Sequence, residues 1–411
     1  MSIGTNWAGY HEYAATTLHR PTSMDELREI VAAAPSIRAL GSRHSFNDLA
    51  DSAELVSLEG LEPSILVDDD SETVSFSAGV RYGDLAAALQ GQGWALRNMA
   101  SLPHISVAGA IATSTHGSGD RNGTLARAVS GLELVTADGG LRTVSPADDE
   151  FDGAVVALGA LGVVTRITLD IEPSYEVRQD VFTGLTWERL LENYDAITSR
   201  AYSVSIFTDW VDDTRTTVWL KSRLDERTPP KELYGGKPLT DDVRLVEGEE
   251  SNTTQQGGVA GPWNERLPHF KMGFTPSNGD ELQTEYLVPR RHALDAVRAV
   301  RELGPRIAPH LHITELRSMA ADSLWLSGAY ETDATAIHFT WKNQPDAVLP
   351  LLPVIEAALE PFDARPHWGK LFHSVRRELY PKLDDFVALA HEFDPAGKFR
   401  NAFLDRYVFA G

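Results

Sequence analysis

Two oppositely charged side chains in a strand-like segment are the first candidates for chemistry. The segment Leu311–Arg317 has the composition of a β-strand, and the period of two along a strand places Glu315 and Arg317 on one face. A carboxylate and a guanidinium on one face can bind one polar ligand together. On spacing alone, an exposed cross-strand ion pair worth about 0–1 kcal/mol is the simpler interpretation.

Two glycine-rich tracts are the second candidate. Gly41–Phe46 reads Gly-Ser-Arg-His-Ser-Phe, and Ser101–Gly119 is crowded with small residues. Small side chains allow the backbone to approach a ligand closely, and a glycine-led loop after a strand can gather N–H groups around a phosphate. Neither tract has the strand-turn-helix context and downstream acidic partner of a dinucleotide fingerprint. The two tracts therefore indicate a large cofactor that is bound in another way.

The elements that must position these residues alternate in the first part of the chain. Ser23 and Glu26 have capping-box spacing before a helix, and residues 36–40 read as a strand that runs into the first tract. Helices are also expected over 82–89 and 149–158, and strands over 131–136 and 162–169. We interpret residues 1–172 as one α+β unit.

The second part of the chain is richer in strands. β-branched and aromatic runs at 203–207 and 216–220 predict an antiparallel sheet with some helices. The stretch 225–258 is rich in Gly, Pro, Thr and acidic residues, so we expect a long, mobile surface loop there.

Composition narrows the class of protein. A chain of 411 residues is long enough for two cores at about 150 residues per domain. The 37 basic and 59 acidic residues give a net charge of -22, which disfavours nucleic acid and anionic membranes as partners. The absence of cysteine excludes disulfides, iron–sulfur clusters and thiolate zinc sites. The N-terminus lacks the pattern of a secretory signal and no stretch is apolar enough to span a bilayer, so a cytoplasmic protein is expected.

The chain resembles the vanillyl-alcohol oxidase superfamily of flavoproteins. Within that superfamily it resembles the alditol oxidase branch, near the aldonolactone oxidoreductases. The resemblance spans nearly the whole chain. Besides the two glycine-rich tracts, it is carried in order by four segments: Trp263–Phe270, Thr284–Pro289, His367–Lys370 and Phe393–Asn401.

The resemblance implies an α+β fold of two domains. Residues 1–172 and the returning segment 372–411 are expected to bind FAD, and residues 173–371 are expected to form an antiparallel-sheet cap over the substrate. It also implies that His44 is bonded covalently to the flavin, whereas a second link through cysteine is impossible here. The implied cofactor contacts are Leu40, Gly41, Ser42, Arg43, His44, Ser45, Ser101, Ser106, Gly109, Thr113, Ser114, Thr115, His116, Gly162, Val163 and Lys370.

The resemblance further implies a substrate pocket formed by Ser101, Glu315, Arg317, His338 and Lys370. These types suit a polyol, whose hydroxyls both donate and accept hydrogen bonds. Arg317 and Lys370 are the candidates for stabilising a developing alkoxide. The general base stays open between His338 and Glu315, since a histidine in the strand-like segment 335–341 is otherwise a packed structural residue.

The expected activity is oxidation of a primary hydroxyl of xylitol, sorbitol or glycerol to the aldehyde, with O₂ reoxidising the flavin and yielding hydrogen peroxide. A monomer without a metal is expected. An aldonolactone oxidase or dehydrogenase with another electron acceptor is the main alternative. A non-haem metal enzyme using His310, His312 and Glu315 is a second, although Glu315 falls on the opposite strand face from the two histidines. A non-catalytic flavin-binding protein is a third.

Overall fold

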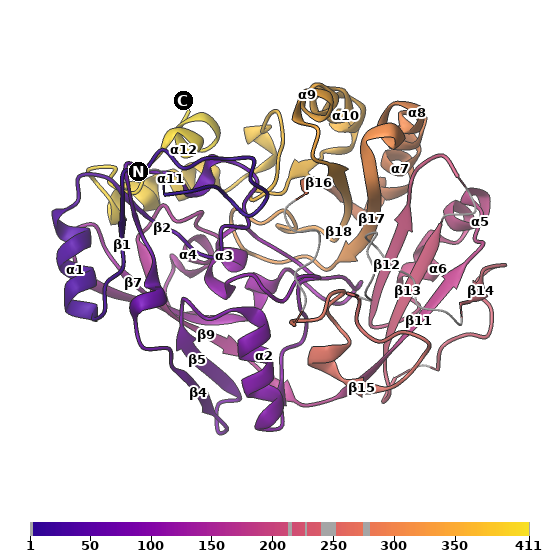
Figure 1. Cartoon of the computed structure of the whole chain (residues 1–411), viewed down its shortest axis with the longest axis horizontal. Helices are drawn as coiled ribbons and strands as arrows, with labels where there is room; N and C mark the ends of the chain where they lie inside the picture. The colour runs from indigo at the N-terminus through magenta and orange to yellow at the C-terminus, as the bar shows by residue number, and fades with distance from the viewer. Residues whose placement is uncertain (1–2, 213–215, 227, 240–251, 274–279, 411) are drawn as a thin grey trace.

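The computed structural model describes residues 3–212, 216–226, 228–239, 252–273 and 280–410. Two antiparallel sheets dominate the fold and lie on opposite sides of the molecule in Figure 1. The first belongs to the N-terminal part of the chain and the second to the middle. The chain contains both α-helices and antiparallel β-sheets, as expected for an α+β fold.

The N-terminal part begins with a small parallel sheet. Helix α1 (Met24–Ala33) starts where the sequence predicts, because the Ser23 side chain accepts a hydrogen bond from the backbone N–H of Glu26. It connects β1 (Thr17–His19) to β2 (Ile37–Ala39), and both pair in parallel with β3 (Glu54–Val56). The first glycine-rich tract directly follows β2.

A five-stranded antiparallel sheet completes this part. Its strand order is β4-β5-β9-β7-β8, with bounds β4 (Ile65–Asp68), β5 (Thr73–Ser77), β7 (Val129–Val135), β8 (Leu141–Val144) and β9 (Val163–Asp170). Helix α2 (Tyr82–Gly91) precedes the second glycine-rich tract, which contains α3 (Val107–Ala112). Gly162, at φ 151°, directly precedes β9, and a Cβ there would lie 2.6 Å from the carbonyl oxygen of Val135. Only glycine fits at this point.

The middle of the chain forms a nine-stranded antiparallel sheet. Its strands are β11 (Glu176–Thr183), β12 (Ser203–Thr208), β13 (Thr217–Arg223), β14 (Lys237–Pro238), β15 (Gly261–Pro262), β16 (Glu281–Pro289), β17 (Leu311–Met319), β18 (Ala334–Lys342) and β19 (Arg365–Pro366). One face is apolar and packs in one cluster with α7 (Ala293–Glu302) and α10 (Leu352–Leu359). The alternate residues of β16, β17 and β18 include polar side chains on the other face, which borders a cavity.

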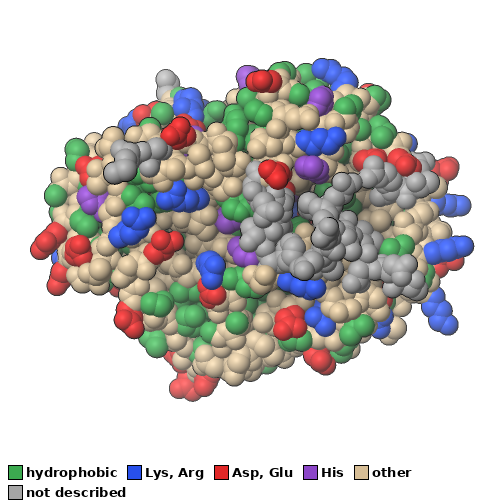
Figure 2. Space-filling view, in the orientation of Figure 1, with side chains coloured by type: hydrophobic (Ala, Val, Ile, Leu, Met, Phe, Trp, Pro, Cys, Tyr) green, Lys and Arg blue, Asp and Glu red, His purple; other side chains and the backbone are tan. Residues whose placement is uncertain are grey.

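Seven further elements are short, and two of them, β6 (Trp94–Ala95) and β10 (Glu172–Pro173), pair with each other. The others are α4 (Phe151–Val155), α5 (Trp187–Glu192), α6 (Tyr194–Thr198), α8 (Gly304–Ile307) and α9 (Pro345–Val348). Among the described residues, no helix has both the length and the apolar composition to cross a bilayer. Lys, Arg, Asp and Glu side chains are interspersed over the face seen in Figure 2, so the charge on that face is not gathered into one patch.

The C-terminal segment returns to the N-terminal part, where Figure 1 shows its yellow helices beside the indigo start of the chain. Helices α11 (Leu383–Phe393) and α12 (Ala402–Tyr407) bury Phe386 and Phe403 in the same core as the five-stranded sheet. Lys398 donates hydrogen bonds to the carbonyl oxygens of Val31, Ala32 and Ala137. Buried Arg38 donates to the carbonyl oxygens of Phe399 and Leu158.

Two expectations from the sequence need correction. The helix expected over 149–158 is only α4 (Phe151–Val155), because the backbone leaves the helical conformation at Val156, with φ -94° and ψ 71°. The expected surface loop 225–258 lies partly outside the described residues, but Asn252, Thr253, Thr254 and Gln256 in it are buried. Thr254 shows how such a segment is accommodated, because its N–H donates to the carbonyl oxygen of His269 and its hydroxyl donates to that of Pro268. A polar composition therefore did not mean exposure here.

Lys398 should contribute to stability because its ammonium group donates hydrogen bonds to three carbonyl oxygens. Replacing it in Lys398→Met removes hydrogen bonds from a charged donor, and we expect a loss of about 2–4 kcal/mol in the free energy of unfolding. Urea denaturation measures this value. Lys382→Met is the control, since Lys382 makes an exposed ion pair with Asp385 and a weak contact over the Trp325 ring, and its replacement should change stability by less than about 1 kcal/mol. Equal losses in both variants would contradict the assignment.

Candidate active site

A cavity of about 530 Å³ lies between the N-terminal part and the nine-stranded sheet. Its walls are the loop 38–50, the tract 100–116, residues 158–164, and polar residues of β16, β17 and β18. This volume is typical of a site for a cofactor or a drug-sized ligand.

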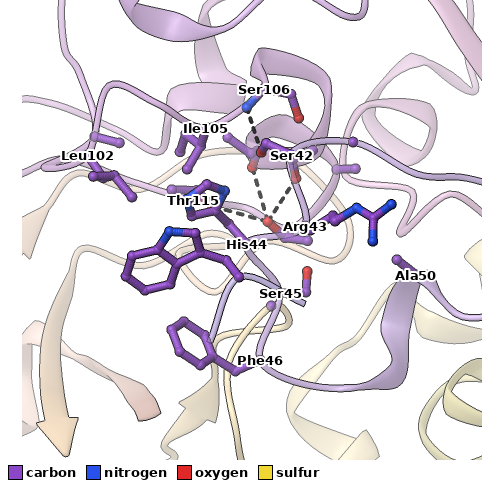
Figure 3. A pocket seen from close by; sticks show the side chains of 18 of the residues that line it. Ser42, Arg43, His44, Ser45, Phe46, Ala50, Leu102, Ile105, Ser106 and Thr115 are labelled. Carbon is purple, nitrogen blue, oxygen red and sulfur yellow. Dashed lines mark hydrogen bonds between the residues drawn. The ribbon is translucent and has the colours of Figure 1, made fainter. Parts of the chain in front are cut away.

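The first glycine-rich tract forms one wall of the cavity (Figure 3). A Cβ on Gly41 would lie 2.7 Å from Ser106 Oγ, so glycine allows the two tracts to touch. The backbone N–H of Ser106 donates to Ser42 Oγ at 2.9 Å. Arg43 has a left-handed backbone with φ 60°, a conformation that non-glycine residues adopt rarely and mostly where the surroundings demand it.

His44 projects from this loop into the cavity wall, and Figure 3 shows it beside Thr115. The Trp7 ring stacks on it, with centroids 5.3 Å apart and an interplanar angle of 22°. Burial lowers the pKa of His44 to about 4, so its imidazole is neutral at pH 7. Its buried Nδ1 makes no hydrogen bond to any described residue. A neutral ring with an unsatisfied nitrogen fits a bond or contact to a bound cofactor.

Glu285 organises the opposite wall. It is 1% exposed, and its Oε1 lies 2.5 Å from Arg317 Nη2 while its Oε2 lies 2.6 Å from Lys370 Nζ. His116 Nε2 is 3.2 Å from Oε1. Burial alone raises the pKa of Glu285, but Lys370 and Arg317 outweigh burial and hold it well below its ordinary value. One carboxylate thus fixes both candidate cations of the site.

Glu315 and Arg317 do share a face of β17, as the period of two predicts. Glu315 Oε2 is 3.6 Å from Arg317 Nε, and both side chains are 5% exposed. Arg317 Nη1 donates to Ser101 Oγ at 3.4 Å. Burial alone raises the pKa of Glu315, but Arg317 and His269 outweigh burial and hold the pKa below its ordinary value. The carboxyl group is therefore an ionised acceptor of hydrogen bonds. The pair is a buried part of the cavity wall rather than an exposed ion pair.

His338 lies between the two carboxylates. It is the cross-strand partner of Glu285 on one side and of Glu315 on the other. Burial and the charge of Lys370 hold its pKa well below the ordinary value, so the ring is neutral at pH 7. Its Nε2 is 3.3 Å from Gln283 Oε1.

Most of the site residues expected from the sequence border this cavity. They are Leu40, Gly41, Ser42, Arg43, His44, Ser45, Ser101, Ser106, Gly109, Thr113, Thr115, His116, Gly162, Glu315, Arg317, His338 and Lys370. Two expected cofactor contacts do not. The Ser114 hydroxyl instead lies 3.2 Å from that of Ser327, and Val163 is buried in the core beneath α1. Left-handed backbone at Ser114 turns its side chain away from its neighbours in the tract.

Other residues of the site were not assigned from the sequence. Glu285 and Gln283 could have been found, because they lie two residues apart on β16 just as Glu315 and Arg317 do on β17. His269, 46 residues before Glu315, contacts it only through tertiary packing. His367 was quoted only as part of a segment, and it also borders the cavity.

The metal alternative finds no support in the geometry. His310 hydrogen-bonds Gln344, His312 is exposed, and Glu315 is buried in the cavity wall. No cluster of three potential metal ligands occurs among the described residues.

Comparisons with known proteins agree with this geometry. Residues 15–145 match the family described as an FAD binding domain, and residues 277–407 match the family described as D-arabinono-1,4-lactone oxidase. The first match contains both glycine-rich tracts. The second contains Glu285, Glu315, Arg317, His338 and Lys370.

Whole-length relatives are also found. The chain is 48% identical over 408 residues to an alditol oxidase of Streptomyces sp. strain IKD472, with 97% of each chain covered. It is 30% identical over 435 residues to an L-gulono-1,4-lactone dehydrogenase of Mycobacterium tuberculosis, with 99% of each chain covered.

Solved structures share the fold. The cholesterol oxidase of Brevibacterium sterolicum superposes with a TM-score of 0.80 at 14% identity, over 99% of this chain and 97% of that one. The fold is therefore that of the vanillyl-alcohol oxidase type, with an FAD-binding part and an antiparallel-sheet cap.

Glu285 should contribute stability that depends on pH. Its folded pKa lies below the unfolded value of about 4.3, so its contribution is complete above about pH 5 and is lost as the pH falls below that. Glu285→Gln leaves buried Lys370 without its carboxylate partner and Arg317 with Glu315 alone, and we expect a loss of about 3–5 kcal/mol at pH 7. Urea denaturation at pH 7 and at pH 4 should show this difference shrinking at the lower pH.

Glu356→Gln is the matched control for this experiment. Glu356 accepts a hydrogen bond from Tyr286, the neighbour of Glu285 on β16, but contacts neither Arg317 nor Lys370. We expect a smaller loss at pH 7. A difference between wild type and Glu285→Gln that stays constant from pH 7 to pH 4 would contradict the role of the ionised carboxylate.

Proposed function

Since this chain belongs to the alditol oxidase family of FAD-dependent oxidoreductases, we propose that its cavity oxidises a primary hydroxyl of a sugar alcohol to the aldehyde. The observation that carries the proposal is the pair of cations, Arg317 and Lys370, fixed on one buried carboxylate at the end of a cofactor-sized cavity. Glu315, His338 and Ser101 beside them supply further groups for hydroxyls.

The residues of the N-terminal part fit FAD. The loop 41–46 and the tract 101–116 offer small side chains and backbone groups for the pyrophosphate and the ring, and His44 offers the nitrogen for the covalent link. Bound FAD supplies the acceptor for the hydride that leaves the carbinol carbon. The link through His44 and the individual cofactor contacts are part of the proposal.

The polar residues of the cap assist the removal of the hydroxyl proton of the substrate. An alcohol about as weakly acidic as water, with a pKa of about 15.7, would cost roughly 12 kcal/mol to ionise freely at pH 7. Arg317 and Lys370 lower this cost by stabilising negative charge on the substrate oxygen, each by about 3 kcal/mol. Neutral His338 has an imidazole nitrogen to accept the hydroxyl proton, whereas Glu315 is held ionised with a lowered pKa and orients other hydroxyls.

We also propose the finer properties of the protein. Oxygen is the electron acceptor and hydrogen peroxide the second product. Residues 1–172 and 372–411 form the FAD-binding domain and residues 173–371 form the cap, in a cytoplasmic monomer.

A second candidate is oxidation of an aldonolactone on the same fold. It is favoured by the match of residues 277–407 to the D-arabinono-1,4-lactone oxidase family and by the similarity to a lactone dehydrogenase. The higher identity to an alditol oxidase, 48% against 30%, favours the polyol.

The covalent link can be tested on purified protein by acid precipitation. The yellow flavin should stay in the pellet of the wild type and move to the supernatant in His44→Ala, because only a covalent bond survives denaturation. His104→Ala is the control, since its Nε2 contacts the carbonyl oxygen of Met272 and it does not border the cavity. Flavin released from the wild type would remove the link from the proposal.

Steady-state kinetics with four substrates test the activity. We expect kcat/KM for xylitol or sorbitol to exceed that for glycerol by about tenfold or more, because a longer polyol offers more hydroxyls to the buried polar groups. L-gulono-1,4-lactone should be a poorer substrate still. A highest kcat/KM for the lactone would favour the second candidate, and a highest value for glycerol would overturn the polyol preference.

A further inference from the structure

A buried lysine lies behind the candidate substrate residues. Lys221 of β13 is 1% exposed and points to the same side of the sheet as the cavity. Its Nζ donates to the carbonyl oxygens of Leu267 and Pro268 at 2.5 and 3.1 Å, and lies 2.9 Å from Nδ1 of His269. These three acceptors match the three N–H bonds of an ammonium group. Burial lowers the pKa of Lys221 to about 7, because removing the charged ammonium group from water is unfavourable.

The contact with Lys221 determines which nitrogen of His269 carries the proton. Nδ1 accepts from the ammonium, so the proton of the neutral ring lies on Nε2. Nε2 is 2.8 Å from Glu315 Oε1 and donates to it. Burial and Lys221 lower the pKa of His269 to about 4, which keeps the ring neutral and this arrangement intact at pH 7.

His269 is also fixed in position. Phe207 and Trp219 pack edge-on against its ring, with centroids 5.6 and 5.2 Å away. Its backbone N–H donates to the carbonyl oxygen of Ser101 at 3.0 Å. One residue therefore connects two of the expected substrate contacts, Glu315 through its ring and Ser101 through its backbone.

We propose that Lys221 and His269 are positioning residues of the polyol site. Lys221 selects the His269 tautomer whose Nε2–H anchors Oε1 of Glu315, and Oε2 is thereby oriented toward Arg317 and the substrate hydroxyls. The proposal rests on the polyol oxidation proposed above. It gives a role to the segment Trp263–Phe270, which the sequence singles out without assigning it one.

The charges of the cluster support this role. The charges of Arg317 and Lys370 balance those of Glu285 and Glu315. Lys221 adds a third positive charge when it is protonated, which with a pKa of about 7 is complete only below neutral pH, and this excess charge favours a developing alkoxide in the cavity. Lys221 contributes this charge without touching the substrate.

Two substitutions of His269 separate its two hydrogen bonds. In His269→Gln the side-chain amide reaches the position of Nε2 and can donate to Glu315. In His269→Asn the shorter amide reaches the position of Nδ1. It can accept a hydrogen bond from Lys221 but cannot donate one to Glu315. We expect KM for xylitol to rise about tenfold or more in His269→Asn with kcat changed less than about threefold, and His269→Gln to recover a KM within about threefold of wild type. Equal KM values in the two variants would overturn the proposal.

Lys221→Met tests the tautomer directly. NMR of protein containing ¹⁵N-histidine distinguishes protonated from unprotonated ring nitrogens, and the His269 signals are identified by their loss in His269→Gln. We expect Nε2–H in the wild type and population of Nδ1–H in Lys221→Met, together with an increased KM. The matched control is Lys342→Met, which removes another lysine that donates to a carbonyl oxygen but lies away from the cavity, and it should leave KM unchanged.

The outcomes distinguish this proposal from the function on which it rests. A wild-type protein that carries flavin but does not oxidise xylitol contradicts the proposed function, and the tautomer is still measured by NMR. A wild type that oxidises xylitol, with the Nε2–H tautomer and KM both unchanged in Lys221→Met, contradicts the positioning role alone. If Lys221→Met does not fold, the comparison of the two His269 variants decides.

Discussion

The carboxylate of Glu285 is the interaction on which the site depends. Isolated charges are expensive to bury, and Arg317 and Lys370 are acceptable in the interior because Glu285 contacts both at 2.5–2.6 Å. Arg317 comes from β17 and Lys370 follows β19, so one carboxylate on β16 joins three parts of the cap. His116 extends the cluster to the glycine-rich tract of the FAD-binding part. The two halves of the cavity thus meet at this group.

The nine-stranded sheet makes such a cluster possible by separating its two faces. Apolar residues such as Tyr286, Leu316 and Phe339 face the helices and form a core, and the residues between them face the cavity. Glu285, His338 and Glu315 form one cross-strand row on that polar face. Their spacing is set by backbone pairing, so the site is formed before a ligand binds. Such preorganisation is what stabilisation of a developing charge requires.

Patterns within one strand or loop could be predicted from the sequence, and contacts between distant segments could not. The helix after Ser23, the loop after β2 and the shared face of Glu315 and Arg317 follow from local rules, and the structure has all three. The FAD-binding fold and the polyol chemistry came from resemblance, which the comparisons support.

The errors have physical causes. The burial of four residues in the segment 252–256 was missed because a polar residue such as Thr254 can be buried when its groups find partners, and composition does not reveal partners. Ser114 was misplaced because its left-handed backbone breaks the pattern of its tract. The contacts of Lys221 and His269 depend on a chain reversal between residues 48 positions apart. No period or spacing signals such a reversal.

The central claim is that Arg317 and Lys370, fixed by Glu285, stabilise the developing alkoxide of a polyol whose hydride bound FAD would accept. The most direct test is anaerobic rapid mixing of the flavin-loaded wild type and Glu285→Gln with xylitol, following loss of the flavin absorbance. We predict rapid bleaching in the wild type and a saturating rate constant about 100-fold smaller in the variant at equal flavin content. Equal rate constants, or a wild type that xylitol does not bleach, would contradict the account.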